Sequence, residues 1–289
     1  MLLQDWAVGV LVPLLPTLLR PPQPSQWAGK LNPLGSSNNQ RWAMKTARVC
    51  IVEGEIAAGK SALIKATCEE LRRQGVKAVP VYEPVDLWRR VGILGAFYAD
   101  PGRYAYSFQT FVYATRALRI AEVVEAEPDA DIYLLERSPV TDTVFMYAQQ
   151  SVADPVEMAL YSYWCQAYAR MLPFDLTKAK VFYLQTSLNE CMNRLSDRAR
   201  KEEIRRGGAP TADDAGGGVS IEYQRKLRAL HEAFFLGRDA ESYPELPESP
   251  FPRESVVVIG PELADLDWRD PAEGQDLAVK KLVELILQA

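Results

Sequence analysis

Residues 48–67 read Arg-Val-Cys-Ile-Val-Glu-Gly-Glu-Ile-Ala-Ala-Gly-Lys-Ser-Ala-Leu-Ile-Lys-Ala-Thr. The apolar residues near its start predict a short buried strand, and an apolar-periodic helix is expected to begin at Lys60. Between them lies Gly54-x-x-x-x-Gly59-Lys60-Ser61, the spacing of a phosphate-binding loop, or P-loop, in its required context of strand, loop and helix. The glycines let backbone N–H groups turn toward an anion, and the helix adds the positive end of its dipole. This stretch therefore predicts a nucleoside triphosphate site rather than a glycine turn before an unrelated helix.

Each part of this loop has an expected task. Lys60 would reach the β- and γ-phosphates of the nucleoside triphosphate, and Ser61 would hold Mg²⁺. The residues predicted to bind the nucleotide are Gly54, Ala57, Ala58, Gly59, Lys60 and Ser61.

Length and composition narrow the remaining choices. The 289 residues are 48% hydrophobic and 25% charged, which fits one large globular domain with or without an appendage. A net charge of −5 argues against a broad nucleic-acid-binding face. The four cysteines have no metal-site spacing and are typical of apolar residues in a reducing compartment. With a single histidine, His231, a His-based metal site or catalytic triad is not expected, and we predict that this residue is packed in the core.

Residues 1–46 differ from the rest of the chain. They begin with an apolar stretch that is too short to span a bilayer as a helix and continue with a Pro-, Ser-, Asn- and Gly-rich segment. We predict a disordered extension, with an organelle-targeting leader or a membrane or partner segment as alternatives, and no stable membrane insertion. The catalytic domain is expected over 47–289, in the cytoplasm, or in mitochondria if the first segment is a transit peptide.

From residue 48 onward, apolar strands alternate with helices. Strands are predicted at 48–53, 76–82, 132–135, 180–184 and 255–259, with helices at about 60–74, 86–98, 102–126, 139–150, 154–171, 188–205, 219–238 and 275–288. This pattern predicts an α/β fold with a five-stranded parallel sheet covered by helices on both faces. Ligands of such sheets bind at the carboxyl ends of the strands.

Two charged motifs fall at those carboxyl ends. Glu83 follows the second strand, where its carboxylate could deprotonate an acceptor hydroxyl beside a bound triphosphate. Glu136-Arg137-Ser138 ends the third strand. The arginine could clamp phosphate with two hydrogen bonds, and Glu136 could reach Mg²⁺ directly or through water. The alternatives are a helix-terminal charge or structural ion pair for Glu83, and a surface ion pair for the second motif.

Three arginines, Arg194, Arg198 and Arg200, lie on the predicted helix 188–205. Near the phosphates they would neutralise charge on the transferred group, whereas elsewhere they would form a solvated helix face. The Gly-rich segment after this helix suggests a helical lid over about 194–218, which would exclude water on closing.

Together these motifs resemble the cellular deoxynucleoside kinase family, which includes deoxycytidine, deoxyguanosine, mitochondrial thymidine and insect multisubstrate kinases. The likeness extends from about residue 47 to the C-terminus, and its motifs occur in family order. They are the P-loop, Tyr-Glu-Pro-Val-Asp-Leu-Trp-Arg at 82–89, Tyr-Ala-Asp-Pro at 98–101, Ser-Phe-Gln-Thr-Phe at 107–111, Leu-Glu-Arg-Ser at 135–138, Arg-Ala-Arg-Lys-Glu-Glu at 198–203, and Ile-Glu-Tyr with Leu-His-Glu at 221–232. The resemblance implies a P-loop kinase fold, ATP with Mg²⁺, a deoxyribonucleoside substrate, and a homodimer built through helices, here 102–126 and 154–171.

The resemblance also implies a role for individual residues. Glu83 would be the general base for the 5′-hydroxyl, and Arg137 would hold that base and the transferred phosphate. Tyr98 and Glu203 would bind the 3′-hydroxyl, and Gln109 the base edge. Trp88, Phe108, Val112 and Phe145 would belong to the nucleoside pocket, with Phe145 as its stacking ring, and Arg198 and Arg200 would be lid arginines over the phosphates.

Two positions bear on base choice. The deoxycytidine- and deoxyguanosine-type kinases carry an Arg and an Asp where this chain has Arg116 and Asp142, and the thymidine-accepting members do not. Such a polar pair can satisfy the edge of a purine or cytosine and would crowd the thymine methyl group. We therefore expect purine deoxynucleosides and deoxycytidine to be preferred; a structural ion pair is the alternative.

The chain also departs from the family pattern. Glu55 stands where the family usually has Asn, so an acid that could weaken ATP binding lies within the loop unless its side chain points away. Ala62 replaces the usual Thr, and the lid loop is longer than in the family.

Three functions remain in view. A deoxynucleoside kinase that uses Glu83 as its base is the leading prediction. A thymidylate-type nucleoside monophosphate kinase would use a phosphorylated acceptor, which the Glu83-Pro84 and Glu136-Arg137-Ser138 motifs argue against. A non-catalytic, kinase-like accessory subunit would need neither Lys60 nor Glu83, yet both are present.

Overall fold

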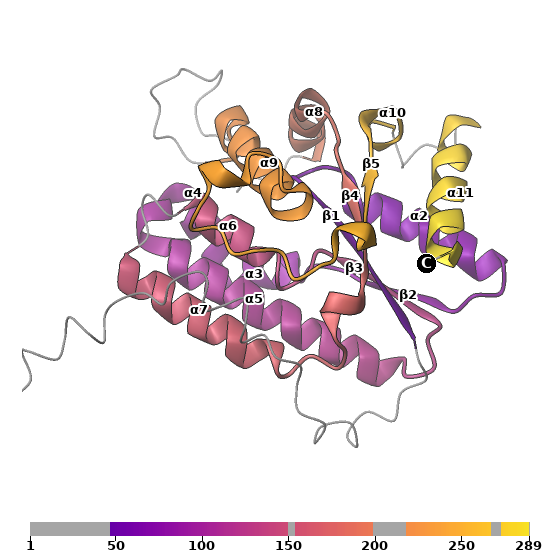
Figure 1. Ribbon diagram of the computed structural model, residues 1–289, viewed down its shortest axis with the longest axis horizontal. Coiled ribbons are helices and arrows are strands. Elements are labelled where there is room, and N and C mark those ends of the chain that lie inside the picture. Colours follow the sequence, from indigo (N-terminus) through magenta and orange to yellow (C-terminus); the bar gives the residue numbers. More distant parts are fainter. Residues whose placement is uncertain (1–46, 150–153, 199–217, 267–272, 289) are drawn as a thin grey trace, which may run out of the picture.

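Five parallel strands form one sheet in the order β2-β3-β1-β4-β5 in the computed structural model, which describes residues 47–149, 154–198, 218–266 and 273–288 (Figure 1). The strands are β1 (Arg48–Gly54), β2 (Ala78–Val81), β3 (Ile132–Glu136), β4 (Lys180–Leu184) and β5 (Val256–Ile259). The predicted α/β fold with a five-stranded parallel sheet is confirmed. The extension at 1–46 and most of the predicted lid lie outside the described residues.

Register brings the functional motifs to one edge of the sheet. β1 lies between β3 and β4, with Val52 opposite Glu136 and Gly54 opposite Leu184. β2 pairs with β3, so Glu83 leaves the sheet one strand away from the P-loop. Because parallel strands end together, the P-loop, Glu83 and the turn after Glu136 emerge side by side.

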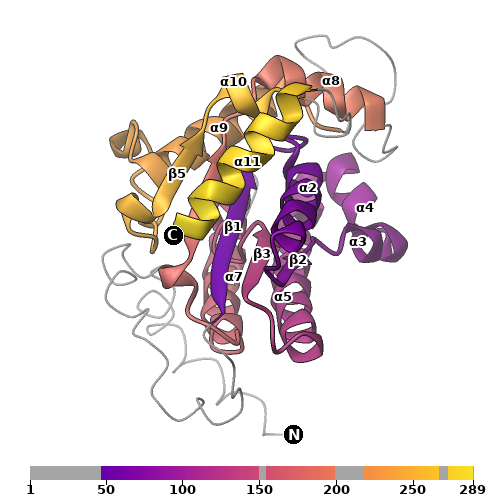
Figure 2. The ribbon, with the colours of Figure 1, turned by 90° about the vertical axis from the view of Figure 1, so that its right-hand side faces the viewer.

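Alternating side chains of the strands divide the core into two layers. Cys50 and Val52 of β1 pack toward α2 (Lys60–Arg73) and α11 (Glu273–Gln288), which lie next to each other in Figure 2. Ile51 packs on the other face, beneath α5 (Pro101–Ala126), α6 (Asp142–Ala148) and α9 (Ile221–Leu236). Burying one such aliphatic side chain contributes about 1.5–3 kcal/mol, so these layers fix which helices cover each face of the sheet. α7 (Pro155–Ala169) packs alongside α5 (Figure 1).

Short helices complete the walls of the site. The helical stretch predicted at 86–98 is present but divided: Gly92, at φ 84°, separates α3 (Val85–Val91) from α4 (Ile93–Ala99). A left-handed residue cannot continue a right-handed helix, and glycine adopts this conformation with little strain. The remaining helices are α8 (Leu188–Arg198) and α10 (Pro261–Ala264), with 3-10 turns at Leu176–Lys178, Ala240–Ser242 and Arg253–Ser255.

Two further features concern the cysteines and the helices. All four cysteines are free, and Cys50, Cys68 and Cys191 are buried as small apolar residues. None of the helices in the described ranges combines the length and the apolar character that crossing a membrane requires.

Candidate active site

The P-loop has the backbone geometry that its glycines predict. Gly54 has φ 143°, and a Cβ atom there would lie 2.7 Å from the carbonyl oxygen of Leu184 on the neighbouring strand. Gly59 has φ 98° and precedes α2 without a side-chain cap. The first intrahelical bond, from Leu63 N to Gly59 O at 3.0 Å, leaves the N–H groups of the first turn without a helical acceptor. An uncapped helix N-terminus of this kind fits a phosphate group.

Side chains from α2, α8, α9 and the segment that follows β4 engage the carbonyls of the loop. Lys60 Nζ donates to Glu55 O at 2.8 Å, and Gln224 Nε2 donates to Ile56 O at 2.7 Å. Ala58 O accepts from Thr186 Oγ1 at 2.7 Å and from Arg194 Nη1 at 2.9 Å. With these carbonyls engaged, the loop can present N–H groups on its other side.

A lysine, a serine and a carboxylate meet beside the loop. Ser61 Oγ donates to Glu136 Oε1 at 2.6 Å, so the two predicted metal-binding groups are adjacent. Burial and the nearby Glu83 raise the pKa of Glu136. Burial and Arg137 lower the pKa of Lys60 to about 8, against the pull of the neighbouring carboxylates. Among the described residues there is no cluster of three His, Cys, Asp or Glu side chains that could hold a metal ion.

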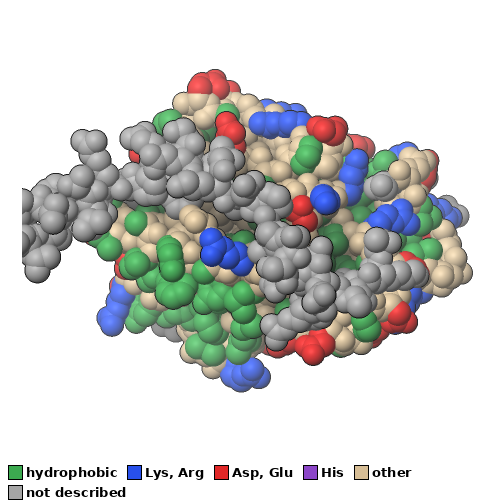
Figure 3. All heavy atoms as spheres, turned by 60° about the horizontal axis from the view of Figure 1, so that its bottom comes forward, with side chains coloured by type: hydrophobic (Ala, Val, Ile, Leu, Met, Phe, Trp, Pro, Cys, Tyr) green, Lys and Arg blue, Asp and Glu red, His purple; other side chains and the backbone are tan. Residues whose placement is uncertain are grey.

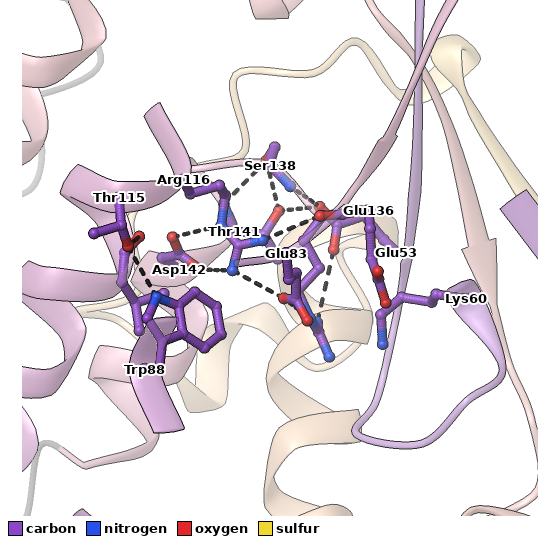
Figure 4. A network of polar contacts seen from close by, with 12 residues as sticks. Glu53, Lys60, Glu83, Trp88, Thr115, Arg116, Glu136, Ser138, Thr141 and Asp142 are labelled. Atoms are coloured by element: carbon purple, nitrogen blue, oxygen red, sulfur yellow. Dashed lines mark hydrogen bonds and ion pairs between the residues drawn. The ribbon is translucent and has the colours of Figure 1, made fainter. Parts of the chain in front are cut away.

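Glu83 forms an ionic network with the buried Arg116 and Asp142 (Figure 4). Arg116 donates to both oxygens of Asp142 at 3.0 and 2.9 Å, to Glu83 Oε1 at 2.9 Å and to Glu136 O at 3.0 Å. Its guanidinium also lies 5.7 Å from the ring of Trp88, a predicted pocket wall. Burial alone would raise the pKa of Glu83, but Arg116, Arg137 and Lys60 outweigh it and lower the pKa to about 2. Glu83 is therefore ionised at neutral pH.

Arg137 also points at Glu83. Its Nε lies 3.2 Å from Glu83 Oε1, and its guanidinium carbon lies 4.5 Å from the centre of the Phe145 ring. Its backbone has φ 62°, and its N–H donates to Val52 O at 3.0 Å, which turns the chain away from the sheet at this point. The alternative of a surface ion pair is wrong for this motif, because both Arg137 and Glu136 are buried.

Glu53 is a site residue that the motifs did not reveal. It is fully buried, accepts from Ser138 N at 2.9 Å and from Thr141 Oγ1 at 2.5 Å, and lies 3.8 Å from Arg137 Nη1. Burial raises its pKa. The sequence held part of the signal, since a charged residue inside a buried strand needs a partner, but it did not show that this partner is Arg137.

His231 is packed in the core, as expected, but it also touches the site. Its Nδ1 lies 2.7 Å from Leu227 O, so the ring donates there and leaves Nε2 as an acceptor 3.5 Å from Arg137 Nη1. Burial, with the charge of Arg137 and against that of Glu55, lowers the pKa of His231 to about 4. The ring is therefore neutral at pH 7.

One cavity of about 430 Å³ joins the phosphate loop to an aromatic compartment. Of the predicted site residues, it is lined by Ala57, Gly59, Lys60, Ser61, Glu83, Trp88, Tyr98, Phe108, Gln109, Val112, Arg116, Glu136, Arg137, Asp142 and Phe145. Gly54 and Ala58 shape the loop without lining the cavity. The side chain of Arg198, together with Arg200 and Glu203, lies outside the described residues, so their predicted roles stay predictions.

Further residues line the same cavity. Phe97 stacks on Phe108 with ring centres 4.6 Å apart, and Tyr82, Asp86, Leu94 and Tyr223 complete the wall. A sequence alone offers no sign that separates these aromatic residues from ordinary core. Arg194 also reaches the cavity and is largely buried, so its expected alternative, a solvated helix face, does not apply to it.

Glu55, the acid that stands where the family usually has Asn, is paired with an arginine in the folded protein. Its side chain points away from the cavity and pairs with Arg228 through two 3.0 Å contacts. Tyr183 donates to the same carboxylate at 2.8 Å. Hydrogen bonds and charge from Arg228 outweigh burial and lower the pKa of Glu55.

The chain is similar to known proteins over most of its length. Residues 50–246 match the family described as deoxynucleoside kinase. The fowlpox virus protein "Probable deoxycytidine kinase FPV151" is 31% identical, over 65% of this chain and 72% of its own length. The thymidine kinase of Ictalurid herpesvirus 1 is 30% identical, over 72% of this chain and 82% of its own. The mitochondrial deoxyguanosine kinase of Xenopus laevis is 25% identical, over 66% and 74%.

Proposed function

Because the chain belongs to the deoxynucleoside kinase family, and is therefore a phosphotransferase, we propose that it transfers the γ-phosphate of ATP to the 5′-hydroxyl of a deoxyribonucleoside. Purine deoxynucleosides and deoxycytidine are its preferred acceptors, and the reaction serves nucleotide salvage. One observation carries this proposal: a single cavity holds the P-loop residues Lys60 and Ser61 together with the carboxylate of Glu83 and an aromatic compartment. A phosphate donor and a nucleoside can therefore meet at Glu83.

Glu83 suits the role of a base that orients the acceptor. Ionised and fixed by Arg116 and Arg137, its carboxylate can accept a hydrogen bond from a 5′-hydroxyl at neutral pH. A pKa of about 2 makes it a weak base, which is sufficient where phosphoryl transfer depends mostly on positioning and charge stabilisation. The main task of Glu83 is then to aim the hydroxyl, and the proton follows late in the transfer.

Charge on the transferred phosphoryl group is balanced by buried cations. Lys60 and Arg137 both line the cavity, and both are close enough to Glu83 to influence its pKa. Because both side chains are buried, their fixed charges stabilise a developing anion more strongly than they would in solvent. Mg²⁺ would be held by Ser61 and Glu136 together with phosphate oxygens, and it would supply further charge neutralisation.

Base preference rests on the Arg116–Asp142 pair. Both side chains line the cavity, are buried, and satisfy each other through two hydrogen bonds. The Asp142 carboxylate has further lone pairs that can accept a hydrogen bond from the amino group of cytosine or a purine. The thymine methyl group would lie against charged groups and could make no such bond. Gln109, also buried and lining the cavity, would add an amide to that edge.

The test is ATP-dependent phosphorylation of deoxyadenosine, deoxyguanosine, deoxycytidine and thymidine by the wild-type protein and by Glu83→Gln. We expect turnover of purines or deoxycytidine, and a loss of about 10²–10⁴-fold in kcat for Glu83→Gln, the usual size of a general-base contribution. The matched control is Glu70→Gln on the exposed face of α2, which should retain wild-type turnover.

Each outcome has a separate meaning. Turnover of thymidine alone would support the proposed nucleoside kinase activity but refute the base preference inferred from Arg116 and Asp142. Turnover of a deoxynucleoside monophosphate but of no nucleoside would refute the acceptor that we propose. Absence of turnover with every acceptor would refute the enzyme and leave an accessory role. The match to the deoxynucleoside kinase family argues against the monophosphate acceptor. The presence of Lys60, Ser61 and Glu83 around one cavity argues against the accessory role.

We also infer a homodimer built through α5 and α7. These two helices pack together, and large apolar side chains remain exposed on them, including Leu118 at 49%, Tyr163 at 63% and Met171, just beyond α7, at 55%. Figure 3 shows hydrophobic side chains gathered on one part of this face. Val156, Leu160 and Trp164 are exposed on the same helix α7. A contiguous apolar surface of this kind is typical of a protein–protein contact.

A further inference from the structure

Helix α9 touches the back of the P-loop at two places one helical turn apart. Gln224 accepts from Ile56 N at 3.3 Å and donates to Ile56 O at 2.7 Å, so it binds that residue as a neighbouring strand would. Arg228, four residues later on the same helix face, pairs with the carboxylate of Glu55 through two 3.0 Å contacts. Consecutive loop residues are thus fixed by consecutive turns of one helix.

A second path links Arg228 to the other end of the loop. Its Nη2 donates to Thr186 O, and the Thr186 hydroxyl donates to Ala58 O at 2.7 Å. Arg228 therefore contacts Glu55 directly and reaches Ala58 through a single residue. The part of the loop that lies between these points includes Ala57, which is held at φ 63°.

The Glu55–Arg228 pair is too buried to be an ordinary surface ion pair. Glu55 is completely buried, the side chain of Arg228 is 22% exposed, and Tyr183 donates to Glu55 at 2.8 Å. Removing one partner of a buried pair leaves a charge without compensation and is strongly destabilising for the local structure. Neither Glu55 nor Arg228 lines the cavity, so the effect of the pair on ligands must pass through the loop backbone.

We propose that Arg228 and Gln224 are positioning residues that set the P-loop for the phosphate donor, with Glu55 as the acidic anchor on the loop. This inference rests on the proposed use of a nucleoside triphosphate at the P-loop. An anion-binding loop must turn its carbonyls outward while its N–H groups converge, and the α9 contacts hold Ile56 O and the Glu55 side chain on the outward side. Small displacements of such donors weaken phosphate binding steeply.

The decisive variant is Arg228→Gln. We expect its dissociation constant for the Mg²⁺ complex of the ATP analogue adenosine 5′-(β,γ-imido)triphosphate to rise at least tenfold, measured by titration calorimetry. The dissociation constant for deoxycytidine should change less than twofold, because Glu83, Gln109 and all the aromatic wall residues except Tyr223 come from other elements. The matched control is Arg225→Gln on the same helix, whose exposed arginine pairs with Glu222 at 3.6 Å and should change neither constant.

A double variant keeps the test meaningful if Arg228→Gln fails to fold. Glu55→Gln with Arg228→Gln removes both charges, leaves no unpaired buried carboxylate, and should show the same selective loss of analogue affinity. The proposal is overturned if the folded variant binds the analogue within twofold of wild type, or if both constants rise together. Binding of the analogue by a wild-type protein that phosphorylates no nucleoside would refute the proposed function alone, and the affinity ratio between variants would still decide this inference.

Discussion

At Gly54 the backbone adopts φ 143°, and the carbonyl oxygen of Leu184 occupies the space where a Cβ atom would stand. Two separate constraints thus act on one position, one conformational and one steric. Gly75, at the end of α2, shows only the first, since it has φ 80° and nothing within 4 Å of an added Cβ. Substituting each of these two glycines therefore distinguishes the effect of backbone strain alone from that of strain combined with a clash against the neighbouring strand.

We expect Gly54→Ala to abolish detectable binding of an ATP analogue, because the loop must move to relieve a 2.7 Å contact with backbone. Gly75→Ala should cost about 1 kcal/mol of stability from left-handed strain and leave analogue binding unchanged. Calorimetric titration measures binding, and urea unfolding measures stability. Wild-type affinity in Gly54→Ala would contradict this geometry of the P-loop.

His231 offers a direct readout of the site, since the chain has only one histidine. Ring-nitrogen NMR of the untagged protein should show a neutral ring protonated at Nδ1, with a pKa of about 4. In the unfolded chain the pKa is near 6.5, so between pH 6.5 and 4 the unfolded state binds more protons and stability falls as pH falls.

The contribution of the neutral His231 ring to the free energy of unfolding is fully present above pH 6.5 and is lost by about pH 4. Its total is roughly 3 kcal/mol. Urea unfolding at pH 7.5 and 5 should therefore show a smaller pH dependence in His231→Gln than in wild type. A ring that titrates near 6.5 in the folded protein would contradict the buried, neutral histidine beside Arg137.

At the level of elements, α9 combines three tasks. Gln224 and Arg228 hold the P-loop, His231 contacts Arg137, and Phe234 and Phe235 pack beneath the sheet. Its position is therefore fixed by apolar burial, while its polar face acts on the site. Ser220 begins the helix, and its Oγ accepts from Tyr223 N at 3.0 Å.

We expect Ser220→Ala to lower the free energy of unfolding by about 1 kcal/mol, the usual cost of losing an N-cap. Because the apolar face of α9 still anchors the helix, nucleoside affinity should change less than twofold. Ser255→Ala is the control, since the exposed Ser255 hydroxyl only donates to Pro252 O and caps no long helix. A loss in Ser220→Ala no larger than in this control would show that α9 does not depend on its cap.

At the scale of the whole molecule, α5 and α7 carry an apolar surface that packing within the chain does not bury. α7 packs on α5 but presents Leu160 and Tyr163 to solvent. Exposed apolar residues are common singly, whereas several along one helix and its neighbour indicate a partner.

Light scattering after size exclusion should give twice the 32.4 kDa mass of the chain. Leu160→Glu with Tyr163→Glu should give the monomer mass, because charges buried in an apolar contact are unfavourable. Val91→Glu, at a 58% exposed position on α3, should remain dimeric. A wild-type monomer at micromolar concentration would contradict the proposed dimer.

The sequence alone determined the strand–loop–helix at residues 48–67, the five strands and the residues at their carboxyl ends, because these depend on local spacing and on alternation along the chain. It did not reveal the interruption between α3 and α4 at Gly92, since the sequence around a lone glycine does not show which backbone angle it adopts.

Only the tertiary structure decided which charges meet. Glu53 and Arg137, Glu55 and Arg228, and Glu83 and Arg116 are separated by 33 to 173 residues, and no local pattern links them. Sheet order places β3 beside β1 and so brings Arg137 to Glu53. Packing of α9 beneath the sheet brings Arg228 to the loop. The burial of apolar layers fixes the positions of the strands and helices and so decides which charged side chains come close together. A buried charge is then stable only if one of these neighbours pairs with it.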